Sequence, residues 1–188
     1  MSRATIADDQ RYMAAAIRFA RRNLGRTGTN PSVSTLLVKD GVIVGRGVTA
    51  IGGRPHAETQ AIAEAGELAK GATAYVTLEP CAHHGHTPPC ADALVTAGVS
   101  RVVVAAKDPD SRVCGKGIAK LQAAGIQVSD GFLVSEAYEG LSGYLSRSTK
   151  KRPEVTVKLA VSKDKMIGRR GERQLAITGQ ISRDQVHI

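Results

Sequence analysis

The sequence predicts a layered α/β fold in which helices cover both faces of a central sheet. From residue 42 onward, short apolar runs typical of strands alternate with stretches typical of helices, and the connections between them are short. With 188 residues, of which 42% are hydrophobic, the chain is long enough for one domain with a real core and a further appendage.

The first predicted element is a helix over residues 9–24. Asp8 and Asp9 offer an N-cap, apolar residues recur on one helical face, and Gly25 is a suitable stop. A β-hairpin should follow over residues 33–48, because two apolar runs flank an Asp-Gly turn.

The later elements follow the same signals of apolar periodicity and glycine stops. Helices are predicted over residues 55–66, 88–98, 117–125 and 134–147, and strands over residues 73–78, 101–106 and 126–128.

A basic, polar stretch punctuated by proline, residues 147–153, is the predicted linker. It divides a domain over residues 1–146 from the start of a second α/β domain over residues 154–188, which should open with a strand at 155–161. This last segment is too small to bury a core of its own.

Composition argues against a nucleic-acid or membrane partner. Aromatic residues make up 3% of the chain and tryptophan is absent, which leaves few rings for base stacking. The net charge of +9 is concentrated late, since nine Lys or Arg face four Asp or Glu after residue 150. No apolar run approaches the roughly 20 residues of a membrane span, and the N-terminus lacks the apolar region of a secretory signal. We therefore expect a cytoplasmic location.

Chemistry-bearing residues cluster between positions 56 and 90. His56 lies at a predicted helix start, Cys81 follows a predicted strand, and Cys90 opens the next helix. One imidazole and two thiolates are a set that binds catalytic zinc and leaves a fourth position open. Glu58, two residues beyond His56, is placed to move protons to and from a water molecule at that position. The constellation predicts hydrolytic deamination of an amino-heterocycle.

Six further strings of residues are informative: Asn30-Pro31, Val38-KDG-Val42-IVG, Pro55-HAE, Ala74-YVTLEPCAHHGHTPPC, Ala97-GVSRVVVA and Asp108-Pro109. Together they resemble one family, the riboflavin-biosynthesis diaminohydroxyphosphoribosylaminopyrimidine deaminases, which usually form the N-terminal half of a bifunctional deaminase/reductase. The spacing of eight residues between Cys81 and Cys90 is typical of that family, whereas other zinc deaminases use Pro-Cys-x-x-Cys. Residues 155–168 are similar to the opening strand of the family's reductase domain, which has a dihydrofolate-reductase-like fold.

The resemblance implies a three-layer α/β/α cytidine-deaminase-like fold with a mixed central sheet. It implies zinc ligation by His56, Cys81 and Cys90, with Glu58 as the proton shuttle. The implied substrate is 2,5-diamino-6-ribosylamino-4(3H)-pyrimidinone 5′-phosphate, a small phosphorylated pyrimidine. The residues expected to contact it are Asn30, His83, His86 and Thr87.

Some positions depart from the family pattern. His86 stands where lysine or arginine is usual and is a weaker, pH-dependent cation. Thr49 replaces a common histidine and Asp110 a common asparagine. Glu79 is interpreted as a structural carboxylate, not as a second acid/base. These departures affect the expected substrate affinity and leave the metal set intact.

No glycine-rich dinucleotide motif follows the linker, so NADPH-dependent reduction is not expected of this chain alone; NADPH would be a cofactor only with a complete reductase domain. A homo-oligomer is possible. Two alternatives stay open: a tRNA or nucleoside zinc deaminase, and a non-catalytic paralogue that binds a pyrimidine or a partner protein.

Overall fold

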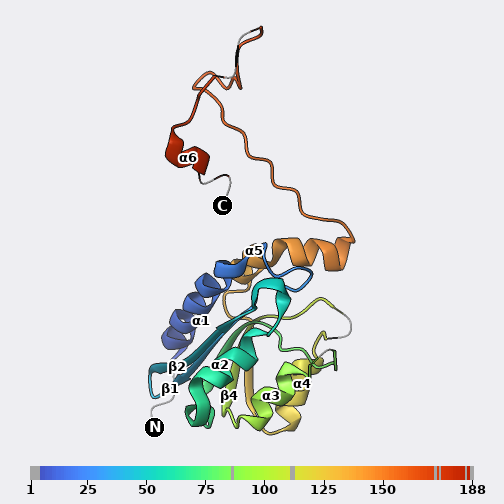
Figure 1. Cartoon of the computed structure of the whole chain (residues 1–188). Helices are drawn as coiled ribbons and strands as arrows, with labels where there is room; N and C mark the ends of the chain where they lie inside the picture. Colours follow the sequence, from blue (N-terminus) through green and yellow to red (C-terminus); the bar gives the residue numbers. More distant parts are fainter. Residues whose placement is uncertain are drawn as a thin grey trace. The chain divides into compact units, whose positions relative to one another are not determined.

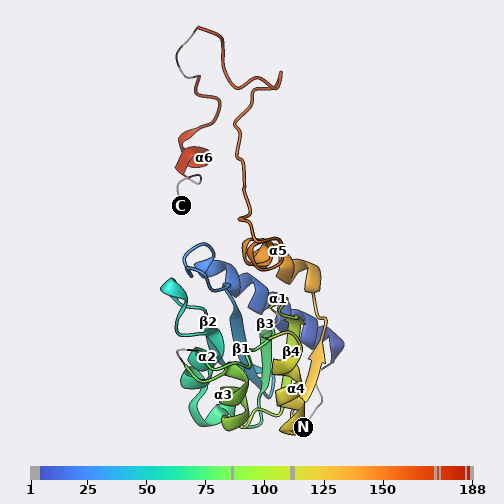
Figure 2. The same cartoon turned by 90° about the vertical axis from the view of Figure 1, so that its right-hand side faces the viewer.

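A five-stranded mixed sheet organises residues 1–154, the larger of two compact units in the computed structural model (Figures 1 and 2). The structure describes residues 5–85, 87–110, 113–171, 173, 175–184 and 186. The strands run in the order β2-β1-β3-β4-β5. Their bounds are β1 Ser34–Lys39, β2 Val42–Val48, β3 Thr73–Leu78, β4 Arg101–Ala106 and β5 Gln127–Asp130.

Strand direction divides this sheet. β1 pairs antiparallel with both β2 and β3, whereas β3, β4 and β5 run parallel. The parallel strands β3 and β4 therefore end at the same edge of the sheet, and the segments that follow them, beginning at Glu79 and Lys107, leave from that edge. The predicted mixed sheet is confirmed, and the predicted hairpin is β1–β2.

Helices cover both faces of the sheet, as predicted. α1 and α5 contact each other and lie over β3 and β4 on one face, while α2 contacts β2 and β1 on the other and is followed there by α3 and α4 (Figure 1). The helices are α1 Ile6–Ala20, α2 Ala57–Ala65, α3 Cys90–Thr96, α4 Lys116–Ala123 and α5 Val134–Leu145. Short 3₁₀ turns lie at Arg21–Asn23, Ile51–Gly53 and Gly66–Ala69.

The first helix begins earlier than predicted. Thr5, not Asp8 or Asp9, is its N-cap: the Thr5 hydroxyl accepts from the Asp8 amide at 3.2 Å, and the Asp8 carboxylate accepts from the Thr5 amide at 3.1 Å. Asp9 is instead buried, where it forms an ion pair with Arg101. The helix also ends at Ala20, and a 3₁₀ turn takes up the last residues of the predicted range.

Two glycines of β2 bring α2 unusually close to the sheet. A Cβ atom at Gly47 would lie 2.0 Å from the Ala57 carbonyl oxygen, and one at Gly45 would lie 2.2 Å from that of Ala61. Neither separation is possible between real atoms, so only glycine permits this packing. The close contact fixes the first turn of α2, which carries the predicted metal and proton-transfer residues.

The predicted linker is largely helical. Ser146–Lys150 form a π-helical turn that continues α5, and the larger compact unit extends to Glu154. The end of α5 is thus followed by a further helical turn, which carries the basic residues Arg147 and Lys150.

In the second unit, residues 155–188, the described residues form one short helix, α6 (Gln180–Asp184). The strand predicted at residues 155–161 is wrong for this structure, because no neighbouring strand supplies hydrogen-bond partners there. Its apolar side chains are exposed, with Val155 at 77%. No described residue of this unit is buried. Across the described part of the chain, no helix is both long enough and apolar enough to cross a membrane.

Candidate metal centre and pocket

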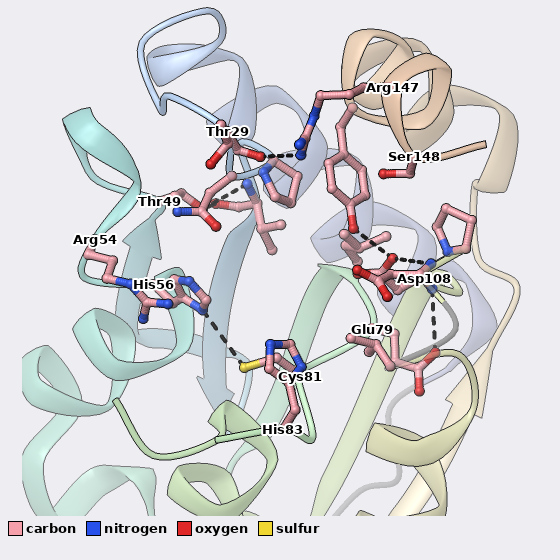
Figure 3. Close-up of a pocket in the computed structure, with 18 of the residues that line it drawn as sticks. Thr29, Thr49, Arg54, His56, Glu79, Cys81, His83, Asp108, Arg147 and Ser148 are labelled. Atoms are coloured by element: carbon pink, nitrogen blue, oxygen red, sulfur yellow. Dashed lines mark hydrogen bonds between the residues drawn. The ribbon is translucent and has the colours of Figure 1, made fainter. Parts of the chain in front are cut away.

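A pocket of about 740 Å³ opens at the edge where β3 and β4 end. Its lining comes mainly from five segments: the loop before β1, the start of α2, the loop after β3, the loop after β4, and the end of α5 with the turn that follows it (Figure 3). These segments are far apart in the sequence, and the parallel pairing of β3 with β4 brings two of them together.

Three predicted metal ligands meet in this region. His56 occupies the N-cap position of α2, Cys81 lies in the loop after β3, and Cys90 is the first residue of α3. The His56 Nδ1 atom is 3.9 Å from the Cys81 sulfur and 3.4 Å from the Cys90 sulfur. All three ligand atoms lie within 4.8 Å of one another.

This donor set fits zinc. Zinc bonds of about 2.3 Å to sulfur and about 2.0 Å to nitrogen place neighbouring tetrahedral ligand atoms about 3.6 Å apart, and the two nitrogen–sulfur distances here are 3.4 and 3.9 Å. His56 Nδ1, not Nε2, faces the sulfurs; Nε2 is buried with no hydrogen-bond partner among the described residues. Three protein ligands leave one tetrahedral position for water or substrate, the arrangement of catalytic zinc sites.

Electrostatics at the cluster favour a thiolate at Cys81. Hydrogen bonds from the Cys90 thiol and from His56 lower the pKa of Cys81 to about 4. The Cys90 backbone amide also donates to the Cys81 sulfur at 3.3 Å. The hydrogen bond to Cys81, followed by burial, raises the pKa of Cys90. The separate hydrogen bond between His56 and Cys81 raises the pKa of His56. Binding of a dication would favour the thiolate form of both cysteines.

Glu58 lies in the first turn of α2, beside this cluster, and is only 4% exposed. Burial and the negative charge on Cys81 raise the pKa of Glu58. A carboxyl group that can hold a proton, next to a position that a metal leaves open, suits general acid–base chemistry.

Two of the predicted substrate residues line the pocket. Asn30 is anchored through its Nδ2, which donates to the Gly53 carbonyl at 3.2 Å. His83 is half-buried beside Cys81, and its Nδ1 is buried with no partner among the described residues. Thr87 is exposed, and its hydroxyl accepts a hydrogen bond from Arg54 at 2.8 Å. His86 lies outside the described residues.

Glu79 has a structural environment, in agreement with its interpretation from the sequence. It is 3% exposed, and its carboxylate accepts from backbone amides of the loop after β4 and of the first turn of α4. The donors are Asp108 at 3.4 Å, Gly115 at 3.0 Å, Gly117 at 3.0 Å and Ile118 at 3.3 Å. This carboxylate fixes the start of α4 against the loop that carries Cys81.

Residues from α5 complete the pocket, which the sequence interpretation missed by assigning positions 147–153 to a linker. Tyr144 donates from its hydroxyl to Asp108 at 2.8 Å, and burial raises the pKa of Asp108. Arg147 lies over the Tyr144 ring and donates to the Thr29 carbonyl at 2.5 Å (Figure 3). The spacing of three between Tyr144 and Arg147, which places both on one helical face, was the available sequence signal.

Two departures from the family pattern have defined environments. The Thr49 hydroxyl accepts from the Val33 amide at 3.0 Å, so it supports the segment before β1 that lines the pocket. The Asp110 amide donates to the Asp108 carboxylate at 2.9 Å, which holds the loop after β4 in a turn.

Comparison with known proteins agrees with this geometry. Residues 6–106 match the family described as the cytidine and deoxycytidylate deaminase zinc-binding region. The chain is 49% identical over 177 residues to the riboflavin biosynthesis protein RibD of Escherichia coli K12, covering 94% of the chain and 48% of the relative.

Two similar crystal structures extend the likeness to the fold. Acinetobacter baumannii RibD, form 1, is 45% identical with a TM-score of 0.87, covering 97% of this chain and 51% of the other. A Thermotoga maritima diaminohydroxyphosphoribosylaminopyrimidine deaminase/5-amino-6-(5-phosphoribosylamino)uracil reductase is 38% identical with a TM-score of 0.88, covering 95% and 52%. The chain thus spans about half the length of the relatives it matches.

Proposed function

Because the chain belongs to the family of the cytidine and deoxycytidylate deaminase zinc-binding region, we propose that it catalyses a zinc-dependent hydrolytic deamination. The observation that carries this proposal is the cluster of His56, Cys81 and Cys90 with the buried Glu58 beside it. We assign zinc ligation to the first three residues and proton transfer to Glu58.

The proposed substrate is 2,5-diamino-6-ribosylamino-4(3H)-pyrimidinone 5′-phosphate, an intermediate of riboflavin biosynthesis. Its support is the identity of 49% to the E. coli riboflavin biosynthesis protein and the likeness to the T. maritima deaminase/reductase. A pocket of about 740 Å³ has room for a ribosylated pyrimidine. Asn30 and His83, which line it, and Thr87 and His86, from the resemblance, are the proposed substrate contacts.

The chain's own residues perform the steps around the reacting carbon. A zinc ion held by the three ligands would lower the pKa of a water molecule and so supply a hydroxide nucleophile. Glu58 accepts the proton of that water and passes protons to the ring nitrogen and to the departing amino group. The new carbon–oxygen bond replaces the carbon–nitrogen bond, and ammonia leaves. The raised pKa of Glu58 makes its carboxyl able to hold the proton between these steps.

We further propose that residues 154–188 are the opening segment of a dihydrofolate-reductase-like domain, after a deaminase domain and the segment 147–153. The alignment of 177 residues with the E. coli relative is longer than the 154 residues of the larger unit, so the likeness continues into this segment. The cytoplasmic location, the homo-oligomer and the absence of reductase activity from this chain stay predictions.

The test is ammonia release from the phosphorylated pyrimidine by the full, zinc-loaded chain. Glu58→Gln should lower the rate by about 10²- to 10⁴-fold while zinc content stays equal to that of the wild type. Glu64→Gln, an exposed glutamate of the same helix, is the matched control. Equal rates for the wild type and Glu58→Gln would contradict the assignment. Release from a tRNA or a nucleoside, but not from the phosphorylated pyrimidine, would favour the alternative deaminase.

A further inference from the structure

Arg54 lies in the pocket wall beside His56, at a position that the sequence analysis left without a role. It is half-buried and belongs to the loop between the 3₁₀ turn Ile51–Gly53 and α2 (Figure 3). Its Nη1 donates to the Thr87 hydroxyl at 2.8 Å. A Cβ atom at Gly85 would lie 3.4 Å from Arg54 Nη2, so the guanidinium rests against the loop that joins Cys81 to Cys90.

The positive charge of Arg54 has no carboxylate partner in the described part of the chain. Arg46 and Arg101, by contrast, form ion pairs with Glu64 and Asp9. The interaction that fixes Arg54 is with a neutral hydroxyl, which uses one of the five N–H donors of a guanidinium. A fixed, uncompensated guanidinium that lines a cavity is suited to an anion, and a phosphate matches its fork of donors.

Lys151, which also lines the pocket, is exposed, and the acidic residues opposite Arg54 favour the same end of the pocket as Arg54. Glu79 and Asp108 lie on the wall opposite Arg54 (Figure 3), where they would repel a phosphate dianion. Arg147, the other arginine of the pocket, is committed to the Thr29 carbonyl and to the ring of Tyr144. Arg54 is therefore the guanidinium best placed for an incoming anion.

We propose that Arg54 and Thr87 form the subsite for the 5′-phosphate of the substrate. Arg54 supplies the permanent charge, and the Thr87 hydroxyl orients the guanidinium and adds one polar contact. The inference rests on the proposed function, because it identifies which residues select a phosphorylated pyrimidine over its riboside. Arg54 is then a phosphate-binding residue whose charge, unlike that of a histidine, does not depend on pH near neutrality.

The decisive experiment compares the phosphorylated pyrimidine with its dephosphorylated riboside in steady-state kinetics. Arg54→Ala should raise KM for the phosphorylated compound by about 10- to 100-fold, the effect of losing a hydrogen-bonded charge pair. The KM for the riboside should change less than about threefold, and kcat should be retained with both, because Arg54 does not contact the reacting carbon. Arg54→Lys should recover part of the loss, since lysine keeps the charge without the fork.

Arg22→Ala is the matched control, because it removes one positive charge from an exposed position outside the pocket. It should leave both KM values unchanged. Thr87→Val should raise KM for the phosphorylated compound by a smaller factor. Its effect should not add to that of Arg54→Ala, since the two residues act as a pair.

Binding of ribose 5-phosphate, measured by calorimetry, supplies a readout that does not need turnover. Its Kd should rise in Arg54→Ala and stay unchanged in Arg22→Ala. The proposal is overturned if Arg54→Ala affects phosphorylated and dephosphorylated compounds equally, or if Arg147→Ala produces the phosphate-specific loss instead. Failure of the proposed function has a different signature: the wild type would release no ammonia from either pyrimidine, whatever the outcome of ribose 5-phosphate binding.

Discussion

Replacing Glu79 by glutamine should destabilise the protein severely while leaving the chemistry of the native enzyme in place. Each carboxylate oxygen of Glu79 accepts from two backbone amides: Oε1 from Gly117 and Ile118, and Oε2 from Asp108 and Gly115. A glutamine side chain keeps one oxygen and presents an NH₂ group to the other two donors. Two amides, one buried and one half-buried, then lose their acceptor.

The expected cost follows from that count. A buried donor left without an acceptor costs about 1–3 kcal/mol, so two such donors lower the free energy of unfolding by about 2–6 kcal/mol. The surroundings cannot relax freely, because a Cβ atom at Gly117 would already lie 2.0 Å from the Pro80 carbonyl oxygen. Water has little access, since Glu79 is 3% exposed.

Urea denaturation followed by circular dichroism measures this cost, with the m-value checked for equality between variants. Glu139→Gln, at an exposed position of α5, is the control and should change stability by less than about 0.5 kcal/mol. At temperatures where Glu79→Gln is folded, its zinc content and kcat should stay within a few-fold of the wild type. A loss of less than about 1 kcal/mol, or a stable variant without activity, would refute the structural assignment of Glu79.

Three further predictions concern other parts of the domain. Burial raises the pKa of Asp108 above its ordinary value of 3.8, so its carboxyl group holds a proton more readily in the folded than in the unfolded state. The stability of the wild type relative to Asp108→Asn should therefore fall as pH rises through the folded pKa. Urea denaturation of both proteins at pH 4 and pH 8 measures this, and the opposite trend would contradict it. Gly47→Ala should lower the free energy of unfolding by about 1–3 kcal/mol or more and weaken zinc binding, because the new methyl group meets the Ala57 carbonyl oxygen. Thermal denaturation measures the loss of stability. Gly140→Ala, where the new methyl group meets no other atom, is the control and should be neutral or stabilising in that assay. Removal of zinc with a chelator should abolish ammonia release and lower Tm. The free energy of unfolding should fall by about 4 kcal/mol if free zinc had exceeded its Kd 1,000-fold. Zinc but not magnesium should restore both activity and Tm, and a Tm unaffected by chelation would be evidence against a zinc site.

Local sequence signals predicted most elements of the fold because they act within a few residues. The hairpin is one case: Asp40 and Gly41 both adopt positive φ, the backbone that a tight Asp-Gly turn requires. The first helix is the contrary case. Asp8 and Asp9 were the predicted caps, but Thr5 caps the helix together with Asp8, and Asp9 is paired with Arg101.

The candidate site divides in the same way. His56, Cys81 and Cys90 could be identified from the sequence because few other roles require one imidazole and two thiols at helix starts and strand ends. The wall formed by Tyr144 and Arg147 was missed, because their spacing of three indicates a shared helical face but not that this face reaches Thr29, 118 positions earlier in the chain. The strand expected at residues 155–161 failed because strand propensity alone cannot supply a neighbouring strand.

By itself, the sequence determined the alternation of strands and helices, the set of one histidine and two cysteines that can hold a metal, and the position of these residues at helix starts and after a strand. These properties depend on residue type and on spacings of a few positions. Only the tertiary structure decided that Glu79 accepts hydrogen bonds from four amides of the loop after β4 and the start of α4, that α5 closes the pocket, and that Arg54 lies against Thr87. The physical reason is the same in each case: these contacts join residues about 30 or more positions apart, and their partners are selected by how the helices pack on the sheet.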